Sequence, residues 1–268
     1  MDTNEAIPVG ATVSGHYKKL QVNRWRASGI HLIISAGIAV TVLTLMLVVW
    51  YPPPLFEAAG GNDLALILVV VDVVIGPLLT LVVFKAGKRG LKLDLVVIAA
   101  FQLVALLYGC HIIFLARPGF VVFVKDRFEV VSVVELESER LAEATYPQFR
   151  NPSWTGPKLV FGAWPTDHAG QRRLLDVTFA GLDLQHFPSY YRPYAEGKAQ
   201  ILSRAQAISR VRETDPSAAR VIDAWLSRSG LNEQGLRYLP LRARQGWVAV
   251  LIDQETARPL KMLLAQKL

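Results

Sequence analysis

The side chain best placed to do unusual chemistry is Asp72, a lone carboxylate inside the apolar run 64–84. A carboxylate in a membrane helix costs roughly 2.5–3.5 kcal/mol on insertion scales, so it must face protein or water, or carry a proton. Two uses fit: a hydrogen bond that locks this helix onto its neighbour, which is the favoured interpretation, or a contact with a partner helix or proton relay. Counted at ~1.5 Å per residue from the outer ends of the helices, Asp72 lies ~15 Å deep and Tyr108 ~12 Å deep in the membrane. Either Tyr108 or Gln102 could therefore approach Asp72.

Two other polar or helix-breaking features lie in the apolar runs. His31 and His111 lie near opposite membrane interfaces, which excludes a shared metal ion, and interfacial hydrogen bonding explains both. Gly76-Pro77 follows Asp72 by one turn and predicts a kink, because proline removes a backbone hydrogen bond. That kink either shapes a groove for another helix or serves simple packing. The candidate contact residues are Asp72, His31, Gly76, Pro77 and Tyr108.

The sequence contains no recognisable enzyme motif. There is no G-x-S-x-G, P-loop or H-E-x-x-H pattern, and the sole cysteine, Cys110, lies in an apolar run. His168 and His186 are isolated along the chain. We therefore expect no catalytic residues, no metal and no cofactor. A membrane-anchored sensor and a membrane enzyme with an undetected site remain the alternatives, although the cytoplasmic parts are too short to provide a sensor's output.

Three apolar runs must position these residues, and each is long enough to cross a hydrocarbon core of roughly 30 Å. They cover residues 30–51, 64–84 and 95–115. Trp50 and Tyr51 close the first run with the aromatic residues that membrane interfaces favour, and three prolines then stop the helix. The first run is too long for the core of a cleaved signal peptide, so we expect it to be retained.

Basic residues predict the orientation, because loops rich in Lys and Arg stay in the cytoplasm. Loop 52–63 contains neither residue type. The basic groups lie before the first run (Lys18, Lys19, Arg24, Arg26) and in the loop after the second (Lys85, Lys88, Arg89, Lys92). The prediction is an inner-membrane protein with a cytoplasmic N-terminus and a periplasmic C-terminal domain.

The division predicted for the chain is a flexible cytoplasmic tail (1–24), a three-helix transmembrane domain (25–116) and a periplasmic domain (117–268). The net charge of +7 is mild and spread along the chain, so nucleic acid is not an expected partner. Expected partners include the lipid bilayer.

Alternating β-branched and aromatic residues predict the fold of the last part. They indicate a hairpin (120–124 with 128–136), a strand (158–164) and a final three-strand meander at 236–241, 247–252 and 260–264. Helical spacing predicts a helix over 198–213 and another that begins at Asp215-Pro216 and ends at Gly230. The expected domain is α+β with mainly antiparallel strands.

Three segments carry a resemblance to a known family. They are RWRASGIH (24–31), WYPPPL (50–55) and VDVVIGPLLTLVVFKAGKRGLKLDL (71–95). Together they resemble the TfpX/TfpZ family of type IV pilin accessory proteins. The likeness is good over 24–136 and looser in the tail around 238–241. Ala86, where the family more often has proline, and the longer N-terminal extension depart from the pattern.

The resemblance implies an inner-membrane factor that assists assembly or display of type IV pili, without established catalytic residues. The implied partners are the type IV pilin subunit and proteins of the pilus assembly platform. A pilin waits in the membrane as an apolar helix with a glutamate near its cytoplasmic end, and His31 lies at a similar depth. The resulting hypothesis is a pilin holder, in which His31 contacts that glutamate and 35–37 (SAG) permits close helix approach.

Overall fold

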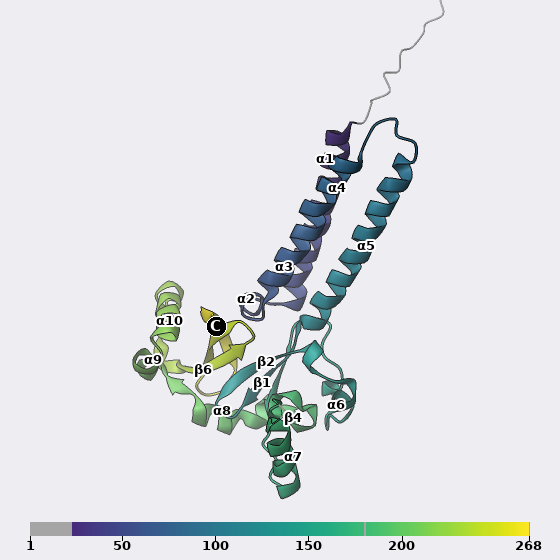
Figure 1. Cartoon of the computed structure of the whole chain (residues 1–268). Coiled ribbons are helices and arrows are strands. Elements are labelled where there is room, and N and C mark those ends of the chain that lie inside the picture. Colours follow the sequence, from purple (N-terminus) through teal and green to yellow (C-terminus); the bar gives the residue numbers. More distant parts are fainter. Residues whose placement is uncertain (1–22, 180, 268) are drawn as a thin grey trace, which may run out of the picture.

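The computed structural model describes residues 23–179 and 181–267, so the tail predicted over 1–24 lies almost wholly outside the described residues. Figure 1 shows two parts: a long helical bundle, and a sheet domain attached to one of its ends. We call these ends of the bundle the domain end and the loop end. The loop between α4 and α5 lies at the loop end.

The bundle contains three continuous helices that are long and apolar enough to cross a membrane: Arg24–Trp50, Gly61–Val83 and Leu91–Ala116. The first is α1 (Arg24–Leu45) followed by a π-helical turn, Met46–Trp50. The second joins α3 (Gly61–Val69), a second π-helical turn (Val70–Ile75) and α4 (Gly76–Val83). The third is α5 (Leu91–Ala116), and the short α2 (Leu55–Ala58) follows the three prolines. The three predicted apolar helices are thus confirmed.

The helices pack unevenly. α1 lies against α3 and α4, whereas α5 contacts mainly α3, α4 and the turn between them. Within α5 only Ile113, close to the domain end, is buried. There the Tyr51 hydroxyl donates a hydrogen bond of 2.9 Å to the Ile113 carbonyl oxygen. α5 is therefore fixed at the domain end and largely uncovered along the rest of its length (Figure 1).

The sheet domain is built on one sheet whose strands run in the order β4-β3-β1-β2-β6-β7-β8, with β5 paired to β6. The strands are β1 (Pro118–Val124), β2 (Arg127–Ser132), β3 (Lys158–Gly162), β4 (Tyr191–Pro193), β5 (Gln206–Ala207), β6 (Leu236–Ala243), β7 (Gly246–Asp253) and β8 (Pro259–Lys267). The helices are α6 (Ser138–Ala142), α7 (His168–Phe179), α8 (Lys198–Arg204), α9 (Ile208–Thr214) and α10 (Pro216–Ser229). Short 3-10 turns connect them.

The sheet is mixed, which corrects the expectation of mainly antiparallel strands. β1 pairs in parallel with β3, and β2 pairs in parallel with β6. The predicted hairpin and the final meander are antiparallel, as expected for strands joined by short turns. Parallel neighbours need a crossover of a dozen or more residues. The long segments between β2 and β3, and between β3 and β6, supply these crossovers, and a local sequence pattern cannot show them.

The predicted helix 198–213 is also wrong as a single element. It is two helices, α8 and α9, separated by the extended Ala205 and by β5, whose Gln206 pairs with Tyr238 of β6. The apolar residues do recur at helical spacing, but they pack in different hydrophobic cores. Ile201 packs in one hydrophobic cluster and Ile208 in another. The helix is therefore interrupted between Ile201 and Ile208, so that each residue can pack in its own core.

The second predicted helix start is confirmed at α10. The Asp215 carboxylate accepts a hydrogen bond of 2.9 Å from the backbone N–H of Ala218, which caps the helix. Gly230 ends the helix with a positive φ of 67°. The left-handed conformation favours glycine at this position.

A compact joint fixes the sheet domain to the bundle. Arg117, only 4% exposed, lies between the end of α5 and the start of β1. Its guanidinium lies 3.5 Å from the centre of the Phe114 ring and donates to the carbonyl oxygens of Phe114 and Ser153. The Gly156 N–H donates to the Val49 carbonyl at 2.7 Å, which attaches the same loop to the first helix.

A second contact joins the β6–β7 turn to the segment between the first two long helices. The backbone N–H of Gln245 donates to the Ala58 carbonyl at 2.8 Å, and its side-chain amide donates to Asp63 at 2.5 Å. Helix ends from all three long helices therefore contact the sheet domain.

One partly buried acid stands out in the sheet. Glu129 of β2 is opposite Arg242 of β6 in the register. Burial raises the pKa of Glu129 from 4.5 to about 7, although Arg242 and Arg127 oppose the shift. The folded state therefore holds this proton over a pH range in which the unfolded chain releases it.

Glu129→Gln is predicted to remove a pH-dependent loss of stability. Between pH 4.5 and about 7 the folded state binds more protons at this site than the unfolded state, so wild-type stability falls as pH rises. The full loss is about 3 kcal/mol at 1.36 kcal/mol per pKa unit. Thermal unfolding of the purified protein between pH 4 and 8 should show a wild-type decline that the variant lacks. Parallel curves for the two proteins would contradict the assignment.

Candidate functional site

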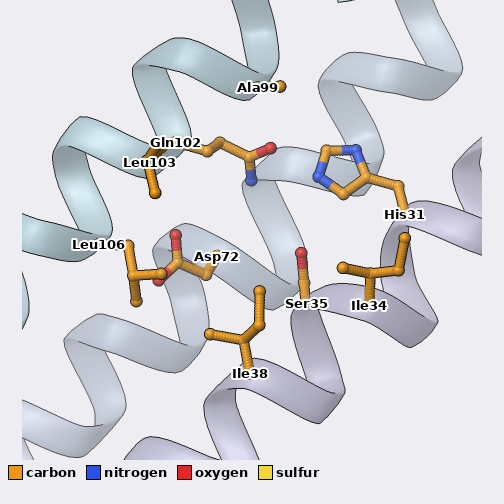
Figure 2. A pocket seen from close by; sticks show the side chains of 9 residues that line it. All are labelled: His31, Ile34, Ser35, Ile38, Asp72, Ala99, Gln102, Leu103 and Leu106. Atoms are coloured by element: carbon orange, nitrogen blue, oxygen red, sulfur yellow. The ribbon is translucent and has the colours of Figure 1, made fainter.

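A cavity of about 200 Å³ lies halfway along the bundle, between α1 and α5. Its walls are apolar: Ile34 and Ile38 from α1, and Ala99, Leu103 and Leu106 from α5. Figure 2 shows four polar side chains around the same space, namely His31, Ser35, Asp72 and Gln102. These come from all three long helices, so the cavity depends on the tertiary packing of the bundle.

Asp72 is the most unusual of these groups. It lies midway along the second long helix, inside the π-helical turn Val70–Ile75, and is only 6% exposed. Pro77 explains the turn, because in a regular helix its ring clashes with the carbonyl of residue 73 and it has no N–H to donate there. π-Helical turns often occur at functional sites. The wide turn places the carboxylate between the second helix and α5 (Figure 2).

The polar groups around the cavity are poorly paired. Among the described residues, no hydrogen bond is formed by the side chains of Asp72 or Ser35, and Ser35 is also only 6% exposed. The Oε1 atom of Gln102 is buried and has no hydrogen-bond partner in residues 23–179 and 181–267. Buried polar atoms in proteins are nearly always paired, so the unpaired Gln102 Oε1 atom is an exception.

Gly76 makes room for Gln102. A Cβ atom added to Gly76 would lie 1.7 Å from the side-chain nitrogen of Gln102, so the amide rests directly on the helix backbone at this glycine. The two predicted features, Gly76 and Gln102, thus belong to one contact between the second long helix and α5. This contact also lies beside Asp72 (Figure 2).

His31 closes the cavity toward the loop end. Its Nδ1 atom lies 2.6 Å from the Thr80 hydroxyl, and the Ser28 hydroxyl donates to the Pro77 carbonyl at 2.9 Å. These two bonds join α1 to α4. His31 therefore ties the bundle together with one ring nitrogen and also lines the cavity.

The other predicted residues lie elsewhere. Tyr108 is 66% exposed on α5 and does not line the cavity, so the structure does not bring it to Asp72; Gln102 takes that position. The basic residues Lys85, Lys88, Arg89 and Lys92 are all exposed, in the connection between α4 and α5 and in the first turn of α5. There Lys88 forms an ion pair of 2.6 Å with Asp94.

Sequence reasoning missed Thr80 and gave Ser35 only a packing role. The signal was present, because Asp72, Gly76 and Thr80 recur every four residues and so share one helix face. All three are buried. A stripe of polar or small residues on a membrane helix favours contact with another helix.

The side chains around the cavity can bind a ligand or a partner by hydrogen bonding. In the described part of the chain, no group of three or more His, Cys, Asp or Glu residues could hold a metal ion. The cavity combines an apolar wall with a few convergent polar groups, which is the usual composition of a binding site.

Comparisons with known proteins identify related sequences. A family model described as "Fimbrial assembly protein FimB" matches residues 20–60. Two fimbrial assembly proteins of Dichelobacter nodosus, of serogroups I and E1, are each 28% identical over 232 residues, which cover 84% of this chain and 90% of each relative. A third, of serogroups C1 and C2, is 36% identical over 122 residues, which cover 44% of this chain and 92% of the relative. No solved structure matches the chain significantly.

Gly76→Ala is predicted to expel the Gln102 amide from its place and to loosen α5 from the second long helix. The side chain can rotate away, so we expect a loss of about 1–3 kcal/mol, as for overpacking elsewhere. Thermal unfolding in mild detergent measures the loss. Gly109→Ala is the matched control, because an added Cβ on this α5 glycine meets nothing within 4 Å. Equal unfolding temperatures for the two variants would contradict the contact.

Proposed function

Since this chain belongs to the FimB family of fimbrial assembly proteins, we propose that it is a non-catalytic membrane factor that holds a pilin subunit before or during assembly of a type IV pilus. The related proteins of Dichelobacter nodosus are named for fimbrial assembly, which supports a role in pilus biogenesis. The holding role is the more specific part of the proposal.

The observation that carries the holding role is the cavity between α1 and α5. It lies at mid-height of the bundle, it is lined by the Gln102 Oε1 atom, which has no hydrogen-bond partner among the described residues, and α5 is largely exposed beside it. A subunit anchored by one apolar helix could lie against this side of the bundle. Its soluble part would then meet the sheet domain, which the Arg117 joint holds at a fixed place.

The proposed orientation follows from the basic residues of the loop end. Lys85, Lys88, Arg89 and Lys92 would lie in the cytoplasm. The sheet domain, at the other end of the bundle, would lie in the periplasm, and the membrane would be the bacterial inner membrane. His31, which lies toward the loop end, would then be near the cytoplasmic face.

His31 is the residue we propose to contact the pilin glutamate. One ring nitrogen is engaged with Thr80, which leaves Nε2 for a partner. A carboxylate entering the membrane needs a hydrogen-bond donor, because lipid supplies none. The imidazole would supply it from a fixed position.

Co-purification tests the proposal. Tagged protein is solubilised from its native host in mild detergent, and retained proteins are identified by mass spectrometry against a mock purification. We expect enrichment of the major pilin. Enrichment of assembly-platform proteins without pilin would move the role to the assembly machine, and recovery of neither class would overturn the proposed function.

His31→Ala is predicted to lower the amount of co-purified pilin and the number of surface pili. The control is Thr80→Val, which removes the hydrogen bond between His31 and Thr80 but keeps the imidazole. If His31 served only to join α1 to α4, the two variants would lose pilin to the same extent. Pilin recovery is quantified by immunoblot at equal amounts of tagged protein.

A further inference from the structure

We propose that the loop 150–156 of the sheet domain lies in the head-group region of the membrane, where Trp154 contacts lipid and holds the domain against the bilayer. The partner is the lipid surface, and the loop that contacts it is distant in sequence from the ends of the long helices. The inference rests on the proposed function in one respect: it takes the bundle to cross a membrane. It depends neither on the pilin nor on the side of the membrane that the domain occupies.

Trp154 is an unusually exposed aromatic residue. With 75% of its surface exposed, it is the most exposed of the tryptophans, all of which lie within the described residues. Its indole N–H donates no hydrogen bond within the part of the chain that the structure describes. An indole combines a large apolar ring with one polar N–H group. Membrane interfaces favour such side chains, because the ring contacts acyl chains while the N–H reaches the head groups or water.

Contacts between aromatic rings place Trp154 at the depth where the long helices end. Its ring centre lies 5.2 Å from that of Phe114, and the Phe114 ring centre lies 5.3 Å from that of Trp50. Phe114 precedes the end of α5 by two residues, or roughly 3 Å along the helix axis, and Trp50 is the last residue of the first long helix. Helices of this length end near the head groups. Trp154 therefore extends an aromatic cluster located at the membrane interface.

Hydrogen bonds fix the backbone of the loop on both sides of Trp154. The Arg117 guanidinium donates to the Ser153 carbonyl at 3.1 Å, and the Gly156 N–H donates to the Val49 carbonyl at 2.7 Å. Both bonds connect the loop to the ends of the long helices. The exposed ring is thus carried by a loop that is attached to the bundle at two points.

A second apolar side chain is exposed near the same joint. Val134 is 63% exposed in the 3-10 turn Val133–Glu135, and the Val133 N–H donates to the Arg117 carbonyl at 3.0 Å. Single exposed apolar residues need no explanation, but Val134 and Trp154 both lie where α5 leaves the membrane. Lipid is the partner that we infer, because it surrounds the ends of membrane-spanning helices and α5 is largely exposed.

Spin labelling of the full-length protein in lipid nanodiscs tests the inference. The sole cysteine, Cys110, is replaced by alanine, and a nitroxide is attached to a new cysteine in the variant Trp154→Cys. Thr155→Cys is the second variant, because Thr155 is exposed on the same loop and its label leaves the indole in place. It is used if Trp154→Cys fails to fold.

Two further labels supply the references. Phe101→Cys is the lipid reference, since Phe101 is 73% exposed near the middle of α5. Trp164→Cys is the water reference, since Trp164 is an exposed tryptophan (44%) of the same domain and its ring centre lies 5.8 Å from the Lys125 ammonium. Lys125 follows the far end of β1, which at ~3.3 Å per residue is about 20 Å from the Arg117 joint.

Collisions of the nitroxide with oxygen, which dissolves in lipid, and with a water-soluble nickel chelate report where each label lies. We expect the ratio of oxygen to nickel collisions in the loop to exceed that at position 164 about threefold and to stay below that at position 101. A ratio equal to that at position 164 would place the loop in water and overturn the inference. Protection from both reagents would indicate contact with protein, such as a second copy of this chain, and would also overturn it.

Quenching by brominated lipid tests the indole itself. The fluorescence that Trp154→Phe removes is measured in nanodiscs of brominated and of ordinary phosphatidylcholine. We expect this difference to be about twofold smaller in brominated lipid, because contact with bromine quenches Trp154 in the wild type. The control is Trp164→Phe, for which the difference should be the same in both lipids. Equal differences for Trp154→Phe in the two lipids would show that the ring does not contact lipid.

The Phe101 label separates this inference from the proposed function. If the label at position 101 contacts lipid while the loop lies in water, the protein remains a membrane factor and the inference is wrong. If the label at position 101 is also in water, the bundle does not cross the bilayer and both fail. Neither experiment contains pilin, so the holding role is tested only by co-purification.

Discussion

The structure depends most on the joint at Arg117, where a buried guanidinium connects the end of the helical bundle to the sheet domain. The side chain lies on the Phe114 ring of α5 and donates to the Ser153 carbonyl in the loop before β3. A buried charge without such partners would be very costly. Because α5 passes directly into β1, which lies inside the sheet, this contact fixes the direction of the whole domain relative to the bundle.

In the bundle that this joint supports, the described hydrogen bonds between helices lie toward the two ends and not around the cavity in the middle. At one end Tyr51 bonds α5 through the Ile113 carbonyl, and toward the other His31 and Ser28 bond α1 to α4. Between them, within the part of the chain that the structure describes, the Asp72 side chain and the Gln102 Oε1 atom form no hydrogen bond. A bundle selected only for stability would gain from apolar residues at these positions.

The sheet domain shows why local patterns give elements but not their neighbours. The hairpin at β1–β2 and the meander β6–β8 follow from alternating residues and short turns, and the structure confirms both. The parallel pairings of β1 with β3 and of β2 with β6 arise through long connections. Likewise, Ile201 and Ile208 share a helical spacing yet pack in separate cores, which only the fold reveals.

The sequence by itself determined the three apolar helices, the isolation of Asp72 and the loop of basic residues, because each depends on composition within one segment. It also placed Gly76 and Pro77 about one turn from Asp72, and it left Tyr108 and Gln102 as the two possible neighbours of Asp72 on the third helix. Only the tertiary structure decided that Gln102 rather than Tyr108 approaches Asp72, because that depends on how α5 is rotated about its axis. It also decided that Ser35 and His31 face the same cavity. The rotation and crossing of helices are set by contacts between segments. A helix that is apolar on all sides shows no single packing face, so its sequence does not predict how it is rotated.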